Sequence, residues 1–166
     1  MLKKMMKNDD ITGKLISAAI AYVSVHPKSA KEIRTYLLKK LRRMDTEDIS
    51  YVEQAISRLT ELRYVDDVAY AEAFITSRNR SKPKGKALLS LELSRKGVDQ
   101  DSITTLFARG ENDGESELAL AQKAFAKKQK SLAHLPLMVQ KKKLFSFLLR
   151  RGFRSEIVSS IVDGRV

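Results

Sequence analysis

The chain has 166 residues and a formal net charge of +12, from 32 Lys and Arg against 20 Asp and Glu. Its apolar fraction of 43% permits a hydrophobic core, whereas the absence of cysteine excludes disulfides, thiolate nucleophiles and zinc–thiolate sites. Because no apolar run approaches the roughly 20 residues that span a bilayer, and the N-terminus lacks the apolar stretch of a signal peptide, we expect a cytoplasmic protein. Its charge attracts polyanions: nucleic acid, an anionic membrane surface or an acidic protein.

Scarce glycine and proline favour helices, and the first third of the chain predicts them clearly. One helix covers about residues 11–25 and ends before Pro27. The next begins at a capping box, in which the Ser29 hydroxyl and the Glu32 carboxylate each satisfy a backbone N–H group. Apolar residues at a spacing of three and four then continue on one face of this helix to Leu41.

Two pairs of acids predict the next helix starts. Asp45 and Asp48 suit the positive end of one helix dipole, and Asp66 and Asp67 suit the start of another. The helix after Asp67 is interrupted by a loop at residues 81–85, which contains proline and glycine.

The rest of the chain repeats the pattern of helix and glycine. A leucine-rich helix ends at Gly97, which we expect to adopt the left-handed conformation just after the last turn. A short helix follows. Residues 110–114 are polar and form the best linker candidate. Further helices are expected at residues 118–129, before Gly152, and after it. The total is about nine helices, and no alternating strand pattern is present.

An internal repeat relates residues 89–98 to residues 144–153 when Gly97 is superposed on Gly152. Leu93 then matches Leu148, the basic pairs match, and an apolar residue follows each glycine. The pattern predicts tandem three-helix units at residues 1–65, 66–110 and 111–166, each stabilised by packing against its neighbour. The alternative is one irregular helical domain in which this agreement is a coincidence.

The positive charge is unevenly distributed. Residues 118–155 contain no acid, whereas residues 45–72 are net acidic. A single lysine is adequately explained as a solvated helix face, but a long acid-free run opposes compaction and predicts an anionic partner. The basic loop at residues 78–86 opens a helix, so its backbone N–H groups are suited to a phosphate or carboxylate; a plain connection between helices explains it equally well.

No catalytic or metal site is expected. His26 and His134 sit beside prolines in connecting segments, and Asp66 with Asp67 reads as a helix cap rather than a paired-carboxylate centre. The sequence contains no phosphate-binding glycine loop, dinucleotide fingerprint or nucleophile elbow. We therefore predict no cofactor, no metal and no enzymatic activity.

Several motifs in order resemble the RecX family. The central ones are LTELRYVDDVAYA at residues 59–71, KPKG at 82–85 and LSRKGV at 93–98. The flanking ones are YVSVHPKSAKEIR at 22–34 and FLLRRGF at 147–153. The likeness covers roughly residues 15–163.

The chain departs from the family pattern at a few positions. Arg63 stands where the family usually has glycine, so the helix before it must end without an easy left-handed residue. His26 replaces the customary arginine, and the first unit is long between residues 41 and 52. These departures concern local geometry rather than the family assignment.

The resemblance implies an elongated, curved array of three-helix repeats, acting as a monomer that lies along a RecA–DNA filament. Family members mostly inhibit the recombinase, ATPase and coprotease activities of RecA in DNA repair, homologous recombination and the SOS response. The implied partners are the RecA filament and single-stranded DNA, reached directly or through RecA, and not a membrane. Two alternatives remain: a general nucleic-acid-binding helical protein acting directly on DNA or RNA, and an adaptor for an unrelated acidic partner.

Two sets of residues follow from these arguments. The basic residues expected to contact the partner or DNA are Arg34, Arg78, Arg80, Lys82, Lys84, Lys86, Arg95, Lys96, Lys141, Lys142, Lys143, Arg150, Arg151 and Arg154. The residues of the family motifs expected to be structural are Tyr64, Asp66, Asp67, Phe74, Gly85, Leu93, Gly97, Leu148 and Gly152.

Overall fold

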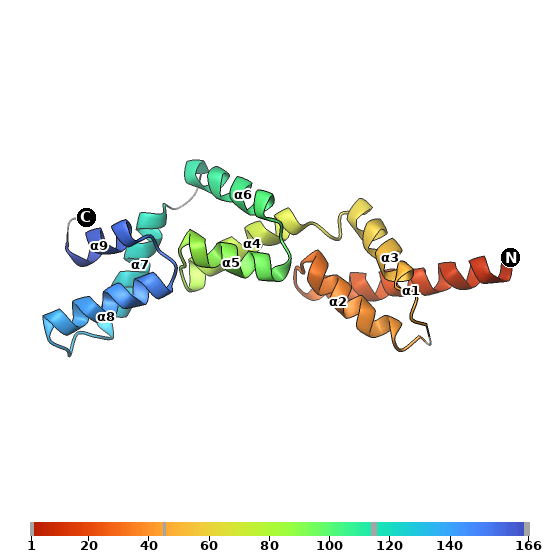
Figure 1. Cartoon of the computed structure of the whole chain (residues 1–166), viewed down its shortest axis with the longest axis horizontal. Helices are drawn as coiled ribbons and strands as arrows, with labels where there is room; N and C mark the ends of the chain where they lie inside the picture. Colours follow the sequence, from red (N-terminus) through yellow and green to blue (C-terminus); the bar gives the residue numbers. More distant parts are fainter. Residues whose placement is uncertain (1, 45, 114–115, 165–166) are drawn as a thin grey trace. The chain divides into compact units, whose positions relative to one another are not determined.

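The regular structure of the protein consists of α-helices. A computed structural model describes residues 2–44, 46–113 and 116–164. Within these ranges it contains nine helices and no strand, which confirms the predicted all-α class (Figure 1). The helices are α1 Leu2–Val25, α2 Ala30–Leu41, α3 Ser50–Glu61, α4 Asp67–Ser81, α5 Lys86–Lys96, α6 Gln100–Asp113, α7 Glu117–Lys130, α8 Leu137–Arg150 and α9 Ser155–Val162.

Two predicted boundaries differ from the structure. The predicted linker at residues 110–114 is wrong over its first four residues, because α6 continues through Gly110 to Asp113; Gly114 lies outside the described residues. A single glycine inside a helix costs only about 1 kcal/mol relative to alanine, too little to end a helix by itself. The start predicted at Asp45 also falls outside the described residues, and α3 begins later, where the Ser50 N–H donates to Asp48 Oδ1 at 3.0 Å.

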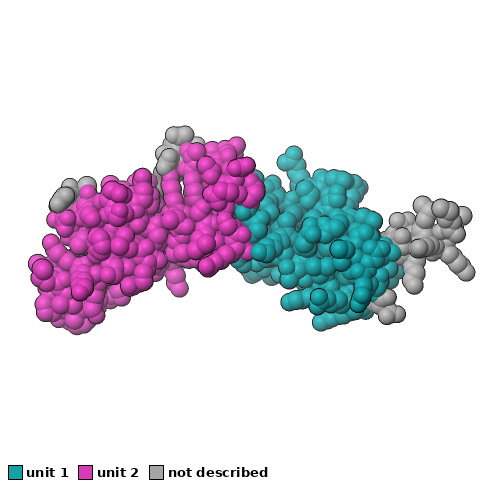
Figure 2. All heavy atoms as spheres, viewed as in Figure 1, with its two compact units in different colours: residues 1–70, 96–98 teal, residues 71–95, 99–166 magenta. Residues whose placement is uncertain are grey.

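The chain divides into two compact units (Figure 2). Unit 1 contains residues 1–70 and 96–98, and unit 2 contains residues 71–95 and 99–166. The division into three repeats with boundaries at 65 and 110 stays a prediction.

Unit 1 is organised around a core formed by α1, α2 and α3, each of which packs against the other two. Leu15 of α1, Ile33 and Leu37 of α2, and Val52 and Leu59 of α3 are fully buried there. The spacings of four residues in α2 and seven in α3 place these side chains on one face of each helix. Removing one such side chain from water stabilises the fold by about 1.5–3 kcal/mol.

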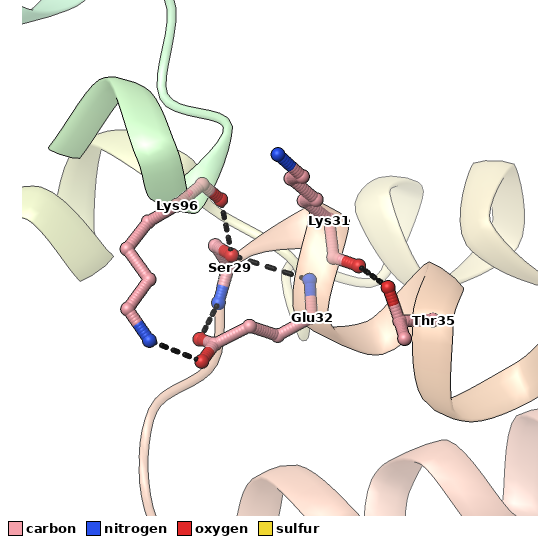
Figure 3. Close-up of polar contacts among 5 residues, drawn as sticks. All are labelled: Ser29, Lys31, Glu32, Thr35 and Lys96. Atoms are coloured by element: carbon pink, nitrogen blue, oxygen red, sulfur yellow. Dashed lines mark hydrogen bonds and ion pairs between the residues drawn. The ribbon is translucent and has the colours of Figure 1, made fainter. Parts of the chain in front are cut away.

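The predicted capping box is present at the start of α2, and it also bonds to a distant segment (Figure 3). Ser29 is fully buried, and its hydroxyl accepts from the Glu32 N–H at 3.3 Å and donates to the Lys96 carbonyl at 2.7 Å. The Glu32 carboxylate in turn accepts from the Ser29 N–H at 3.2 Å and from Lys96 Nζ at 2.7 Å. A local cap thus also attaches residues 96–98 to α2.

Two further contacts complete this junction. The Ala30 N–H donates to Asp67 Oδ1 at 2.8 Å, so an acid of α4 satisfies another N–H group at the start of α2. Gly97 has a φ of +92°, as predicted, and a Cβ there would lie 2.7 Å from Lys31 Cβ. Glycine is therefore required both by the backbone angle and by the close approach of α2.

The ionisation of Glu32 is coupled to the same contacts. Burial opposes its negative charge, but the hydrogen bonds from Lys96 and the Ser29 N–H, with the attraction of Lys96 and Lys28, outweigh burial and lower its pKa below the ordinary value of 4.5. Because the folded pKa is depressed, this stabilisation is present above pH 4.5 and is lost as the pH falls through the folded pKa.

The end of α3 adopts the left-handed conformation without a glycine. Arg63 has a φ of +58°, the one positive φ among the described non-glycine residues. The Tyr64 N–H donates to the Leu59 carbonyl at 2.8 Å, and the Arg63 N–H donates to the Thr60 carbonyl at 3.0 Å, which together are typical of a Schellman helix end. Arg63 thus adopts the left-handed backbone conformation that a glycine would adopt without strain at this helix end.

The internal repeat is visible in the burial of its matched residues. Leu93 and Leu148 are both 0% exposed, and Val98 and Phe153 are both 3% exposed. Gly152 has a φ of +80°, close to that of Gly97. The helices α7, α8 and α9 pack against one another around a core that includes Leu148 and Phe153. Equal burial at matched positions confirms the register of the repeat.

We expect Ser29→Ala to lower the free energy of unfolding by about 1–3 kcal/mol, because it removes a helix cap and leaves the partly buried Lys96 carbonyl without its hydrogen bond. Urea denaturation followed by circular dichroism measures this change. Ser24→Ala is the matched control, since Ser24 is exposed and bonds only within its own helix, to the Ile20 carbonyl; its effect should stay within about 0.5 kcal/mol. Equal effects of the two substitutions would contradict the role assigned to Ser29.

Candidate polyanion-binding surface

Among the described residues, at least five of the fourteen cations predicted to contact a partner are paired with acids of the same chain. The pairs are Arg34 with Glu53, Lys96 with Glu32, Arg154 with Glu117, and both Arg78 and Lys84 with Glu92. Most of these acids are far from their partners in sequence, so the order of charges along the chain does not reveal the ion pairs. Since each acid offsets a positive charge, these cations attract an external polyanion less strongly than their number suggests.

Six of the predicted cations have neither an acid nor an aromatic partner within the described ranges. They are Arg80, Lys82, Lys141, Lys142, Lys143 and Arg150. Lys86 lies over the ring of Phe107, and Arg95 is also engaged within the chain. The six lie in unit 2, at the end of α4, in the connection to α5, and along α8. Unit 2 therefore carries most of the uncompensated charge among the predicted contacts.

The connection between α4 and α5 is fixed against the end of α8. The Gly85 N–H donates to the Arg151 carbonyl at 2.8 Å, and Arg151 Nη1 donates to the Pro83 carbonyl at 3.3 Å. A Cβ on Gly85 would lie 2.0 Å from the Gly152 carbonyl oxygen, closer than any side chain permits. Two segments far apart in the sequence therefore meet through their backbones, and Gly85 is required by this close approach.

A cleft of about 640 Å³ lies in unit 2 beside this connection. Its apolar lining comes from Ile75, Leu89, Leu106, Phe107 and Leu120. Its charged lining comes from Arg80, Lys84, Lys86, Arg109 and Lys123, with Glu72 and Glu117. A lining that combines apolar residues with mainly cationic charged residues suits an acidic segment that carries an apolar side chain. Arg109 and Lys123 were not among the predicted contacts.

Lys127 and Lys128 lie in the acid-free run but were not among the residues predicted to contact a partner. The buried face of α7 includes Leu120, Ala121 and Ala124. Lys127 and Lys128 follow Ala124 by three and four residues, so they continue the same face beyond the apolar core. Their spacing from Ala124, rather than the lack of acids around them, is the sequence pattern that could have identified these two lysines.

The motif residues occupy different structural roles. Asp66 caps α4 by accepting from the Ala69 N–H at 2.9 Å, and Asp67 accepts from Ala30. Phe74 lies under the Arg78 guanidinium, 4.7 Å from ring centroid to Cζ. Tyr64, by contrast, is 47% exposed, so its ring contributes less to the core than its place in the motif suggests.

The described residues contain no group of three His, Asp or Glu side chains placed to hold a metal ion. His26 and His134 are exposed and lie between helices, as predicted. Within the described residues, no helix combines the length and the apolar character that a membrane span requires.

Comparisons with known proteins agree with this architecture. Models of the second and third three-helix domains of RecX match residues 66–105 and 115–162. A regulatory protein RecX from Prosthecochloris aestuarii is 32% identical over 94% of this chain and 96% of its own length. Another, from Halalkalibacterium halodurans, is 33% identical over 95% of this chain, and the match spans 56% of its own length. The chain thus corresponds to little more than half of some relatives and to nearly all of others.

Two crystal structures share the fold. That of RecX from Lactobacillus salivarius aligns with a TM-score of 0.74 over 93% of this chain and 96% of its own, at 23% identity. A second regulatory protein RecX aligns with a TM-score of 0.77 over 96% of this chain and 75% of its own, also at 23% identity. Tandem helical domains and the names of these relatives define a class of helical-repeat regulatory proteins. The chain belongs to the RecX family.

We expect Gly85→Ala to destabilise the protein by about 2–3 kcal/mol, because the added methyl group overlaps the backbone of Gly152. Gly13→Ala is the matched control. Gly13 lies in α1 with nothing within 4 Å of a built Cβ, so the same change should stabilise by about 0.5–1 kcal/mol. Thermal and urea unfolding of both variants measure these changes. An unaltered or increased stability of Gly85→Ala would contradict the close backbone contact.

Proposed function

We propose that this protein is a non-enzymatic regulator that binds RecA–DNA filaments and mostly inhibits the recombinase, ATPase and coprotease activities of RecA. The observation that carries the proposal is family membership: relatives that match nearly the whole chain are named regulatory protein RecX. In this proposal the protein acts as a monomer in the cytoplasm, during DNA repair, homologous recombination and the SOS response.

The distribution of charge supports binding to an extended anionic assembly. A single exposed ion pair contributes only about 0–1 kcal/mol, so affinity must come from many contacts made together. Unit 2 offers such a set in the six unpaired cations on α4, on α8 and in the connection between α4 and α5. A filament repeats its binding surface along its length, so it can engage several of these cations at once.

The lining of the larger cleft supports a contact with a protein partner, in addition to a contact with DNA made elsewhere on the surface. Its lining includes Leu89, Leu106 and Phe107, which nucleic-acid phosphates cannot contact favourably, and its charged residues are mainly cations. An acidic segment of a protein partner that carries an apolar side chain satisfies both features. We propose the three predicted repeats as the framework that presents these sites.

The direct test measures DNA-dependent ATP hydrolysis by RecA with increasing amounts of this protein. We expect substoichiometric protein to depress the rate, and an excess of single-stranded DNA not to restore it. Hydrolysis by an unrelated ATPase stimulated by single-stranded DNA serves as the control and should not change.

Two results would argue against the proposal. An unaltered RecA rate at saturating protein would refute it. Inhibition of both ATPases that is relieved by excess DNA would instead indicate the alternative, a general nucleic-acid-binding protein that only sequesters DNA.

A further inference from the structure

A second, smaller cleft of about 320 Å³ lies in unit 2, where the connection between α4 and α5 meets α7 and α8. It is lined by Ser81, Lys82, Pro83, Ala124, Lys127, Lys128, Phe147 and Arg151. All four charged residues are cations, whereas the larger cleft also contains Glu72 and Glu117. The smaller cleft therefore has the more uniformly positive lining.

The positions of two of these cations are set by the fold. The Arg151 guanidinium stacks on Phe147, with 5.0 Å from Cζ to the ring centroid, and bonds to the Pro83 carbonyl. Lys128 Nζ lies 5.8 Å from the centroid of the same ring. These contacts hold the cations in place but do not neutralise them. No carboxylate in the described ranges pairs with Lys82, Lys127, Lys128 or Arg151.

Four like charges that converge on one concave surface raise its electrostatic potential and favour a bound anion. Phe147, the one aromatic residue among the described residues that line the cleft, already has its ring in contact with Lys128 and Arg151, so this ring is less available to a peptide side chain. Lysines are compact point charges, and an arginine fork matches phosphate oxygens. These features favour phosphate groups over an acidic peptide.

We propose that the cleft of Lys82, Lys127, Lys128 and Arg151 binds the phosphate backbone of a nucleic-acid strand directly. This inference rests on the proposed function, because the strand is that of the RecA–DNA filament. It assigns the DNA contact to the smaller cleft and leaves the larger, amphipathic cleft to protein.

The test uses the double variant Lys82→Gln with Lys127→Gln, because both lysines are exposed and neither has a partner within the described chain. The matched control is Lys39→Gln with Arg43→Gln, which removes two exposed cations from unit 1. A third variant, Lys82→Arg with Lys127→Arg, keeps the charge. Circular dichroism establishes that all three variants retain their helices.

Binding of a labelled oligothymidylate is measured by fluorescence anisotropy over a series of salt concentrations. Each lost phosphate contact lowers the salt slope by about 0.7 for single strands, so the glutamine variant should lose about 1.4 units of slope. At 0.1 M salt this corresponds to roughly 25-fold weaker binding. The arginine variant and the unit 1 control should keep the slope of the unmodified protein.

The inference fails if the glutamine variant and the unit 1 control show the same slope, even where the unmodified protein inhibits RecA. It also fails if the glutamine variant loses affinity for polyglutamate while its affinity for DNA is unchanged, since the cleft would then recognise an acidic protein. If instead the slope falls as expected but RecA hydrolysis is untouched by the unmodified protein, the cleft stands and the proposed function fails.

Discussion

The structure depends on one kind of junction, which occurs twice. In each case the residue before the start of a helix donates a hydrogen bond to the carbonyl that precedes a left-handed glycine. The Ser29 hydroxyl bonds to Lys96 before Gly97, and the Gly85 N–H bonds to Arg151 before Gly152. One junction uses a side chain and the other a backbone group, yet both link segments more than sixty residues apart. Through this junction, a helical array with short local units gains long-range order.

The second junction also explains where positive charge gathers. By fixing the connection between α4 and α5 against the end of α8, it brings Lys82 and Arg151 into one cleft, which α7 completes with Lys127 and Lys128. Several cations outside this cleft are offset by acids of the same chain, as Arg78 and Lys84 are by Glu92. The net charge of +12 is therefore less informative than the few places where cations converge without an acid.

Most of the helices could be predicted from sequence, because apolar spacing, the capping box at Ser29 and the glycine at position 97 each have a local cause. The features that could not be predicted have tertiary causes. Arg63 adopts a left-handed conformation that its residue type disfavours, because the end of α3 requires it. The ion pair between Arg154 and Glu117 joins residues 37 positions apart, so no local sequence pattern predicts it. The lysines of α7 gain their role only from the neighbouring α8 and the α4–α5 connection.

The most direct measurement of the central junction is hydrogen exchange of the Gly85 amide by NMR. This amide donates to the Arg151 carbonyl at 2.8 Å, and Gly85 is buried, although it lies between helices rather than within one. The account predicts that it exchanges as slowly as the amides of core residues such as Leu93 and Leu148, because it opens only when the unit unfolds. Exchange at the rate of an unstructured peptide would contradict the junction and, with it, the placement of both segments that form the cleft.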